Sequence, residues 1–201
     1  MEQPLRIGDV ARSLSPLDEA RARAWASDLS SAAEQTEAPR LARFMRGDTD
    51  LARSLAAIMD LSPYLGGTML RRPDWIERLF DQDAGARIAD LLTDLSAPLE
   101  SGVSESATMM RLREAKAEAS LLIGLRDLLG AADEKRTTAD LSDLAQAAIG
   151  HALRFCLLDL HRRGQLALPD EADPERGCGL VVLGMGKLGG RELNYSSDVD
   201  L

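Results

Sequence analysis

The chain has 201 residues and a formal net charge of −9, and aromatic residues make up only 3% of it. This acidic balance excludes the basic surface that a phosphate backbone requires, so we expect no nucleic-acid partner. Hydrophobic residues at 45% and charged residues at 28% are ordinary proportions for a globular protein. A core that must rest on Leu, Ala, Ile, Val and Met favours helices packed on helices.

Export and membrane signals are not visible in the sequence. The first ten residues have no apolar stretch, and no segment approaches the roughly 18 apolar residues that span a bilayer. The two cysteines, Cys156 and Cys178, are not spaced as a metal site, and Cys156 in its apolar helical run is expected to lie in the core. We therefore expect a cytoplasmic protein with reduced thiols and no membrane partner.

Residues 1–165 carry the pattern of a helical domain. Most of the expected helices begin at a capping residue or at a proline in the first turn. The first expected helix runs from Ser15-Pro16 to Glu34. The next four begin, in chain order, at Pro39, at Asp48 or Thr49, at Ser62-Pro63 and at Arg72-Pro73. The last three cover residues 86–95, 105–129 and 139–163, the last with Thr137 or Thr138 as its cap. Long helices joined by short links are typical of a bundle.

Few individual residues of this domain indicate chemistry. His151 and His161 lie ten residues apart on one expected helix. They are therefore about 80° apart around its axis and nearly three turns apart along it. That arrangement argues against a shared metal site, so we expect solvated or core-edge histidines. Trp75 is expected to anchor the core.

The character of the sequence changes after Gln165. Residues 166–178 form a polar connector with two prolines, and Leu180-Val181-Val182-Leu183 then supplies four consecutive apolar residues, two of them β-branched. Such a run predicts a buried strand. It leads into residues 184–190, whose four glycines would let main-chain N–H groups approach an anion closely.

Two aspartates follow the glycines, in the order Asp198-Val199-Asp200-Leu201. In a strand the two carboxylates would share one face, with their Cα atoms about 6.6 Å apart. Neighbouring carboxylates repel each other unless a cation lies between them, and oxygen ligands select Mg²⁺ or Mn²⁺ over zinc. Such ions screen the charge of phosphates during phosphoryl transfer.

Two other phosphate-binding motifs fit less well. The order Gly184-x-Gly186-x-x-Gly189 after a strand satisfies the dinucleotide fingerprint of a Rossmann domain. However, little room remains for the long helix, and Asp198 arrives only fourteen residues after Gly184, where about 20 are expected. A P-loop is excluded because Val181 stands where it needs glycine and Leu188 replaces its Ser or Thr.

The nucleotidyltransferase pattern fits better. It consists of an apolar residue, Gly and Gly or Ser, a spacer, and then Asp-apolar-Asp-apolar. Leu183-Gly184-Met185 and Asp198-Val199-Asp200-Leu201 match it across twelve residues, with Met185 as the departure. The string GMGKLGGRELNYSSDVDL closely resembles the motif of bacterial bifunctional glutamine synthetase adenylyltransferase/adenylyl-removing enzymes. LRRPDWIERLF in the helical part is similar too, so the resemblance covers roughly residues 60–201.

The resemblance implies a reaction and its partners. Enzymes of this family carry two related nucleotidyltransferase domains, and the Asn-Tyr-Ser-Ser wording is similar to the N-terminal, adenylyl-removing copy. That copy would remove AMP from a tyrosine of glutamine synthetase, with phosphate as acceptor and ADP as product. The other copy would adenylylate the same protein with ATP, under a nitrogen-regulatory signal protein. The family thus implies Mg²⁺ or Mn²⁺, ATP or ADP, and a role in nitrogen assimilation.

The resemblance also implies roles for single residues. Asp198 and Asp200 would hold the metal as catalytic residues. The groups expected to meet phosphate oxygens are those of Gly184, Gly186, Lys187 and Ser197.

The expected fold is mostly α. A helical bundle over residues 1–165 and a connector over 166–178 precede the first strands of an α+β nucleotidyltransferase domain over 179–201, the signature segment. The third carboxylate of such a site and the second catalytic domain are not in the sequence, so we expect a truncated chain that is inactive alone. Three alternatives stay open: a helical protein-interaction module of the same enzyme, a nucleotidyltransferase with another target, and a Rossmann-type protein.

Overall fold

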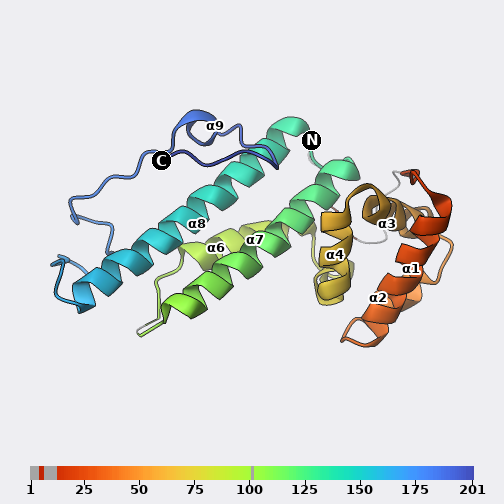
Figure 1. Ribbon diagram of the computed structural model, residues 1–201, viewed down its shortest axis with the longest axis horizontal. Coiled ribbons are helices and arrows are strands. Elements are labelled where there is room, and N and C mark those ends of the chain that lie inside the picture. Colours follow the sequence, from red (N-terminus) through yellow and green to blue (C-terminus); the bar gives the residue numbers. More distant parts are fainter. Residues whose placement is uncertain (1–4, 7–12, 101) are drawn as a thin grey trace. The chain divides into compact units, whose positions relative to one another are not determined.

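The computed structural model describes residues 5–6, 13–100 and 102–201. This part of the chain is built from helices joined by short links (Figure 1). The helices are α1 (Glu19–Glu34), α2 (Pro39–Met45), α3 (Asp50–Leu61), α4 (Pro63–Arg71), α5 (Pro73–Glu77), the 3-10 helix η1 (Arg78–Phe80), α6 (Ala84–Ser96), α7 (Glu105–Leu128), α8 (Glu134–Arg162) and α9 (Gly186–Gly189). None of these described helices combines the length and the hydropathy that crossing a membrane requires.

The described residues divide into two compact units. The first holds the described residues up to Ile88 together with Ser120–Glu134, and the second holds Ala89–Ala119 together with Lys135–Leu201. Helix α7 therefore contributes its last nine residues to the first unit and its earlier residues to the second. The expected domain boundaries near residues 165 and 178 stay a prediction.

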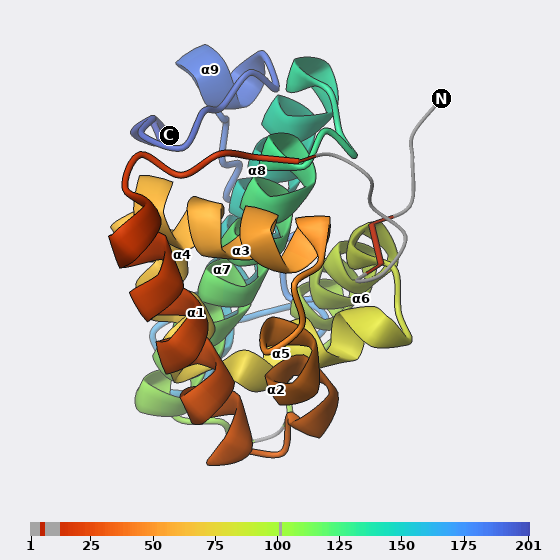
Figure 2. The same ribbon diagram turned by 90° about the vertical axis from the view of Figure 1, so that its right-hand side faces the viewer.

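The first unit is organised around the apolar face of α3. Leu55, Ile58 and Met59 are fully buried, as their helical spacing predicts. Small residues let the neighbouring helices approach: a Cβ atom added at Gly66 of α4 would lie 3.2 Å from Met59. In the same unit α1 lies alongside both α2 and α3 (Figure 2).

Local capping signals placed most helix starts correctly. The Thr49 hydroxyl accepts the N–H of Ala52 at the start of α3, and Pro39 and Pro63 each occupy a first turn. The start expected at Ser15-Pro16 is wrong, because α1 begins at Glu19 with Asp18 as its N-cap. Likewise α8 begins at Glu134, so Thr137 and Thr138 lie inside the helix instead of capping it.

A buried carboxylate on α3 explains the start of α1. Asp60 accepts the backbone N–H groups of Leu17 (2.8 Å) and Asp18 (3.0 Å), and its other oxygen pairs with the Nε of Arg21. The hydrogen bond from Arg21, helped by the two backbone N–H groups, holds the pKa of Asp60 below its ordinary value despite burial. These hydrogen bonds fix the chain before α1 to α3, and the helix therefore begins about one turn later than Ser15-Pro16 predicts.

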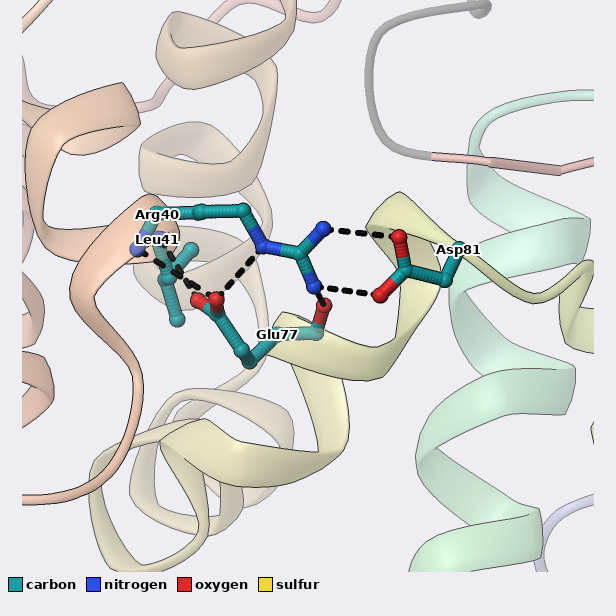
Figure 3. A network of polar contacts seen from close by, with 4 residues as sticks. All are labelled: Arg40, Leu41, Glu77 and Asp81. Atoms are coloured by element: carbon teal, nitrogen blue, oxygen red, sulfur yellow. Dashed lines mark hydrogen bonds and ion pairs between the residues drawn. The ribbon is translucent and has the colours of Figure 1, made fainter.

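A second carboxylate supplies the cap that α2 lacks (Figure 3). Its N-cap residue, Ala38, makes no side-chain hydrogen bond. The carboxylate of Glu77, from α5, accepts the N–H groups of Leu41 (2.7 Å) and Arg40 (3.3 Å) and the Nε of Arg40 (2.8 Å). The same guanidinium binds both oxygens of Asp81 at 2.7 and 2.6 Å. Glu77 is only 9% exposed, so it joins the two helices from inside the unit.

We expect Glu77→Ala to lower the free energy of unfolding of the first unit by about 1–3 kcal/mol, because the buried N–H of Leu41 loses its acceptor. Urea denaturation measures this change. Asp81→Asn is the matched control: it touches the same guanidinium from an exposed position and should have a smaller effect. Equal losses in the two variants would contradict the capping role.

The lowered pKa of Asp60 gives a pH dependence with a definite sign. Ionised Asp60 stabilises the folded chain fully above its unfolded-state pKa, and this contribution is lost as the pH falls through the lower folded-state pKa. The difference in unfolding free energy between the wild type and Asp60→Asn should therefore stay constant from about pH 7 to about pH 5 and shrink below about pH 4. Asp28→Asn, at an exposed position of α1, should show no such trend.

The second unit joins α6, α7 and α8 through backbone carbonyls at the end of α6. The carbonyl of Leu95 accepts from Arg154 of α8 (2.5 Å) and lies 2.9 Å from Nδ1 of His151, while the carbonyl of Asp94 accepts from Arg111 of α7 (2.7 Å). His151 is 1% exposed, and burial lowers its pKa. It is thus a core residue of this unit, and burial favours the neutral form of its ring.

Two expectations about single residues are settled by burial. Cys156 is exposed, so the prediction that it lies in the core is wrong. Trp75 is buried and its ring lies 4.3 Å from the guanidinium carbon of Arg72, which confirms it as an anchor of the first unit. In the apolar run around Cys156, Leu157 and Leu158 carry the buried face.

The α+β part of the expected fold is wrong, although the helical bundle is confirmed. In the part of the chain that the structure describes, no residue is in a β-strand. Leu180–Leu183 runs as exposed coil, with Val181 78% and Leu183 65% exposed, and Asp198–Leu201 is coil as well. A strand needs neighbours that satisfy its backbone and cover its apolar face. Among the described residues, Asp198–Leu201 has a single backbone hydrogen bond, from Met185 to Asp200, and Leu180–Leu183 has no backbone–backbone hydrogen bond.

Candidate functional site

The glycine-rich part of the signature segment folds into a tight turn around α9. The N–H groups of Gly189 and Gly190 donate to the carbonyls of Met185 and Gly186, both at 3.0 Å. A Cβ atom at Gly189 would lie 2.4 Å from the carbonyl oxygen of Gly184, a distance that no side chain tolerates. Gly186 has φ +52°, in the left-handed region that favours glycine. These positions therefore require glycine for the shape of the loop.

The loop and the aspartate pair meet through the backbone. The N–H of Met185 donates to the carbonyl of Asp200 at 2.9 Å. A Cβ atom at Gly186 would lie 3.4 Å from Oδ2 of Asp200, so this carboxylate stands beside the glycine turn. The structure thus brings together Gly186 and Asp200, two of the residues that the sequence selected.

Asn194 shapes the approach to the aspartates, and sequence reasoning missed its role. Its Oδ1 accepts from the N–H of Ser196 (3.1 Å) and from the hydroxyl of Ser197 (2.8 Å). The N–H of Asn194 in turn donates to the Ser197 hydroxyl at 3.1 Å. An Asn with serines two and three residues later is a signal for such a side-chain turn. The Ser197 hydroxyl, expected to face phosphate, is engaged with Asn194 in this structure.

The remaining predicted residues are exposed. Lys187 lies on the surface of α9, and Asp198 and Asp200 are exposed in the coil that follows the Asn194 turn. Among residues 5–6, 13–100 and 102–201, none forms an ion pair with either aspartate or with Lys187. Both carboxylates therefore keep their oxygens available to a ligand.

The donor set of the aspartate pair fits a hard divalent cation. The described residues contain no group of three or more His, Cys, Asp or Glu side chains that could hold a metal ion by itself. Asp198 and Asp200 supply only carboxylate oxygens, which suit Mg²⁺ or Mn²⁺ rather than zinc. Mg²⁺ commonly takes one or two carboxylates and completes its shell with water and phosphate oxygens, so the pair fits the protein share of such a site.

The short helix weighs against the Rossmann alternative. A dinucleotide fingerprint opens a long helix whose N-terminus holds the pyrophosphate. Helix α9 has only four residues, ends at Gly189, and is followed by Arg191 with φ +57°. The described chain after the glycines therefore lacks the element on which dinucleotide binding depends.

Comparison with known proteins supports the sequence resemblance. Residues 52–201 match the family model described as glutamate-ammonia ligase adenylyltransferase. Proteins named bifunctional glutamine synthetase adenylyltransferase/adenylyl-removing enzyme are similar to the chain: that of Mesorhizobium japonicum is 46% identical over 95% of it, and that of Brucella suis 43% identical over 94%. These matches place the chain within a class of nucleotidyltransferases. The chain belongs to the glutamate-ammonia ligase adenylyltransferase family.

The matched relatives are much longer than the chain. It spans about a fifth of their length, 20% for the Mesorhizobium japonicum protein and 19% for the Brucella suis protein. A third relative, from Xanthobacter autotrophicus, is 47% identical over 70% of the chain and 14% of its own length. No solved structure matches the chain.

We expect Gly189→Ala to open the glycine turn, because the added Cβ collides with the carbonyl of Gly184. Amide hydrogen exchange at positions 189 and 190 should accelerate, whereas the melting temperature should change little since the turn is exposed. Gly190→Ala is the matched control: its φ is −79° and its Cβ would lie at an ordinary 3.5 Å from the carbonyl of Gly186. The steric argument fails if both variants exchange alike.

Proposed function

We propose that the protein carrying this chain transfers adenylyl groups on glutamine synthetase, and that the signature segment belongs to its adenylyl-removing site. Family membership and the names of the relatives support this proposal. The structural observation that carries it is the position of the Asp200 carboxylate beside the glycine turn, with Oδ2 3.4 Å from where a Cβ atom of Gly186 would lie. A phosphate-binding loop beside a metal-binding carboxylate is what nucleotidyl transfer requires.

The proposed reaction is a phosphorolysis. An oxygen of inorganic phosphate attacks the α-phosphorus of the AMP that is esterified to a tyrosine. The new P–O bond gives ADP, and the bond to the tyrosine oxygen breaks, so that the phenolate leaves and takes up a proton. The ATP-dependent adenylylation of the same tyrosine is proposed for a second catalytic domain of the whole protein, as the double name of the relatives suggests.

Each residue of the signature segment has a proposed part in this reaction. Asp198 and Asp200 would hold Mg²⁺ or Mn²⁺, which when bound neutralises phosphate charge. The main-chain N–H groups of Gly184 and Gly186 would donate to phosphate oxygens, and exposed Lys187 would add a positive charge. Ser197 could donate to phosphate only after its hydroxyl releases Asn194.

The partners follow from the reaction. Glutamine synthetase is the proposed protein substrate, and ATP, ADP and phosphate are the proposed small-molecule substrates and products. A nitrogen-regulatory signal protein as effector, and regulation of nitrogen assimilation, rest on the family resemblance alone. The cytoplasm is the proposed location, because ATP and a metabolic enzyme meet there.

Substituting the aspartate pair tests the proposal in the intact protein. We expect Asp198→Asn and Asp200→Asn each to lower ADP release from adenylylated glutamine synthetase at least roughly 100-fold, because a charged ligand of the cation is lost. ATP-dependent adenylylation and the melting temperature should stay unchanged. Glu192→Gln, an exposed carboxylate of the same segment, is the matched control and should keep full activity.

The same assay separates the catalytic role from the helical interaction module. Full ADP release by both aspartate variants would contradict the proposed site and favour a segment that only docks glutamine synthetase. The 201-residue chain tested alone should release no ADP, because its described residues provide neither a sheet nor a third carboxylate at the site.

A further inference from the structure

The signature segment is attached to α8 at two adjacent residues. The N–H of Leu193 donates to the hydroxyl of Ser142 at 3.3 Å, and the guanidinium of Arg191 lies 2.7 Å from a carboxylate oxygen of Asp143. Figure 1 shows α9 beside the first half of α8, in agreement with these contacts. All four residues belong to the second compact unit.

The attachment includes a buried residue of the segment. Leu193, 4% exposed, is the one buried hydrophobic residue among the described residues 179–201. The hydroxyl of Ser142 is used in both directions, since it accepts from Leu193 and donates to the carbonyl of Thr138 at 2.8 Å. Ser142 is itself 1% exposed, so the attachment point is a fixed part of α8.

The backbone of Arg191 indicates that its side chain is needed. Its φ of +57° lies in the left-handed region that favours glycine, and it is the one non-glycine residue with positive φ among those described. The two residues directly before it are glycines, whereas this position, where glycine would be unstrained, carries arginine. Arginine at this position is accounted for by the contact of its guanidinium with Asp143.

We propose that Ser142 and Asp143 of α8 are positioning residues for the adenylyl-removing site, an inference that rests on the proposed function. They fix Arg191 and Leu193, which stand between the glycine turn and the Asn194 turn. The Asn194 turn leads directly to Asp198 and Asp200. The two residues on α8 therefore set where the carboxylates lie relative to Gly186, without touching the substrate themselves.

Charge reversal in the intact protein tests this role. We expect Asp143→Arg to lower the kcat of ADP release at least roughly 10-fold and to raise the Mg²⁺ concentration at half-maximal activity. Hydrogen exchange at the amide of Leu193 should accelerate in parallel. Combining Asp143→Arg with Arg191→Asp restores the pair with reversed charges and should recover most of the kcat, the Mg²⁺ dependence and the slow exchange.

The pair Asp159–Arg163 provides the matched control at the C-terminal end of the same helix. It is also an Asp–Arg pair on the surface, at 2.8 Å, but it does not touch the signature segment. Asp159→Arg should leave kcat and the Mg²⁺ dependence unchanged. Ser142→Ala, which removes the acceptor of the Leu193 N–H but leaves the Asp143–Arg191 pair intact, should also accelerate exchange at Leu193.

Two results distinguish the inference from the proposed function. If Asp200→Asn abolishes ADP release while Asp143→Arg behaves like Asp159→Arg, the positioning role is overturned and the proposed function stands. If Asp200→Asn has no effect on ADP release, the proposed function fails, and the positioning role fails with it. Loss of activity in Asp143→Arg without recovery in the double variant also overturns the positioning role.

Discussion

The candidate site depends on one backbone hydrogen bond, from the N–H of Met185 to the carbonyl of Asp200. It joins the glycine turn to the aspartate pair across fifteen residues of chain and places Oδ2 of Asp200 beside Gly186. The glycine turn itself requires Gly189, because an added Cβ atom there would lie 2.4 Å from the carbonyl oxygen of Gly184. The glycines thus allow the shape of the loop, and the hydrogen bond to Asp200 places a carboxylate beside it.

Carboxylates have two physically different uses in this chain. Asp60 and Glu77 are buried, accept backbone N–H groups at the starts of other helices and pair with arginines. Removing Glu77 would leave the buried N–H of Leu41 without an acceptor, and removing Asp60 would release the chain before α1 from α3. Asp198 and Asp200 are exposed and form no ion pair with a described residue. The same functional group thus acts structurally where donors surround it and remains available for a cation where they do not.

Helix α8 connects the helical part of the chain to the signature segment within the second unit. Its buried His151 and its Arg154 converge on the carbonyl of Leu95, and these contacts fix the helix to the end of α6. On another turn, Ser142 and Asp143 hold the segment that carries the aspartates. Helix α8 thus supplies a rigid surface that holds the mostly exposed signature segment in one arrangement.

The sequence by itself determined what depends on local chemistry. Thr49, Ser62 and the prolines at 39 and 63 specify helix starts through their own side chains, and the glycine and aspartate spacing specified the family. Tertiary structure alone decided the rest. It moved the N-cap of α1 to Asp18, because a carboxylate 42 residues away binds the backbone there, and it buried His151 while exposing Cys156. It also left Leu180–Leu183 as coil, because an apolar run becomes a strand only where other strands accept its hydrogen bonds.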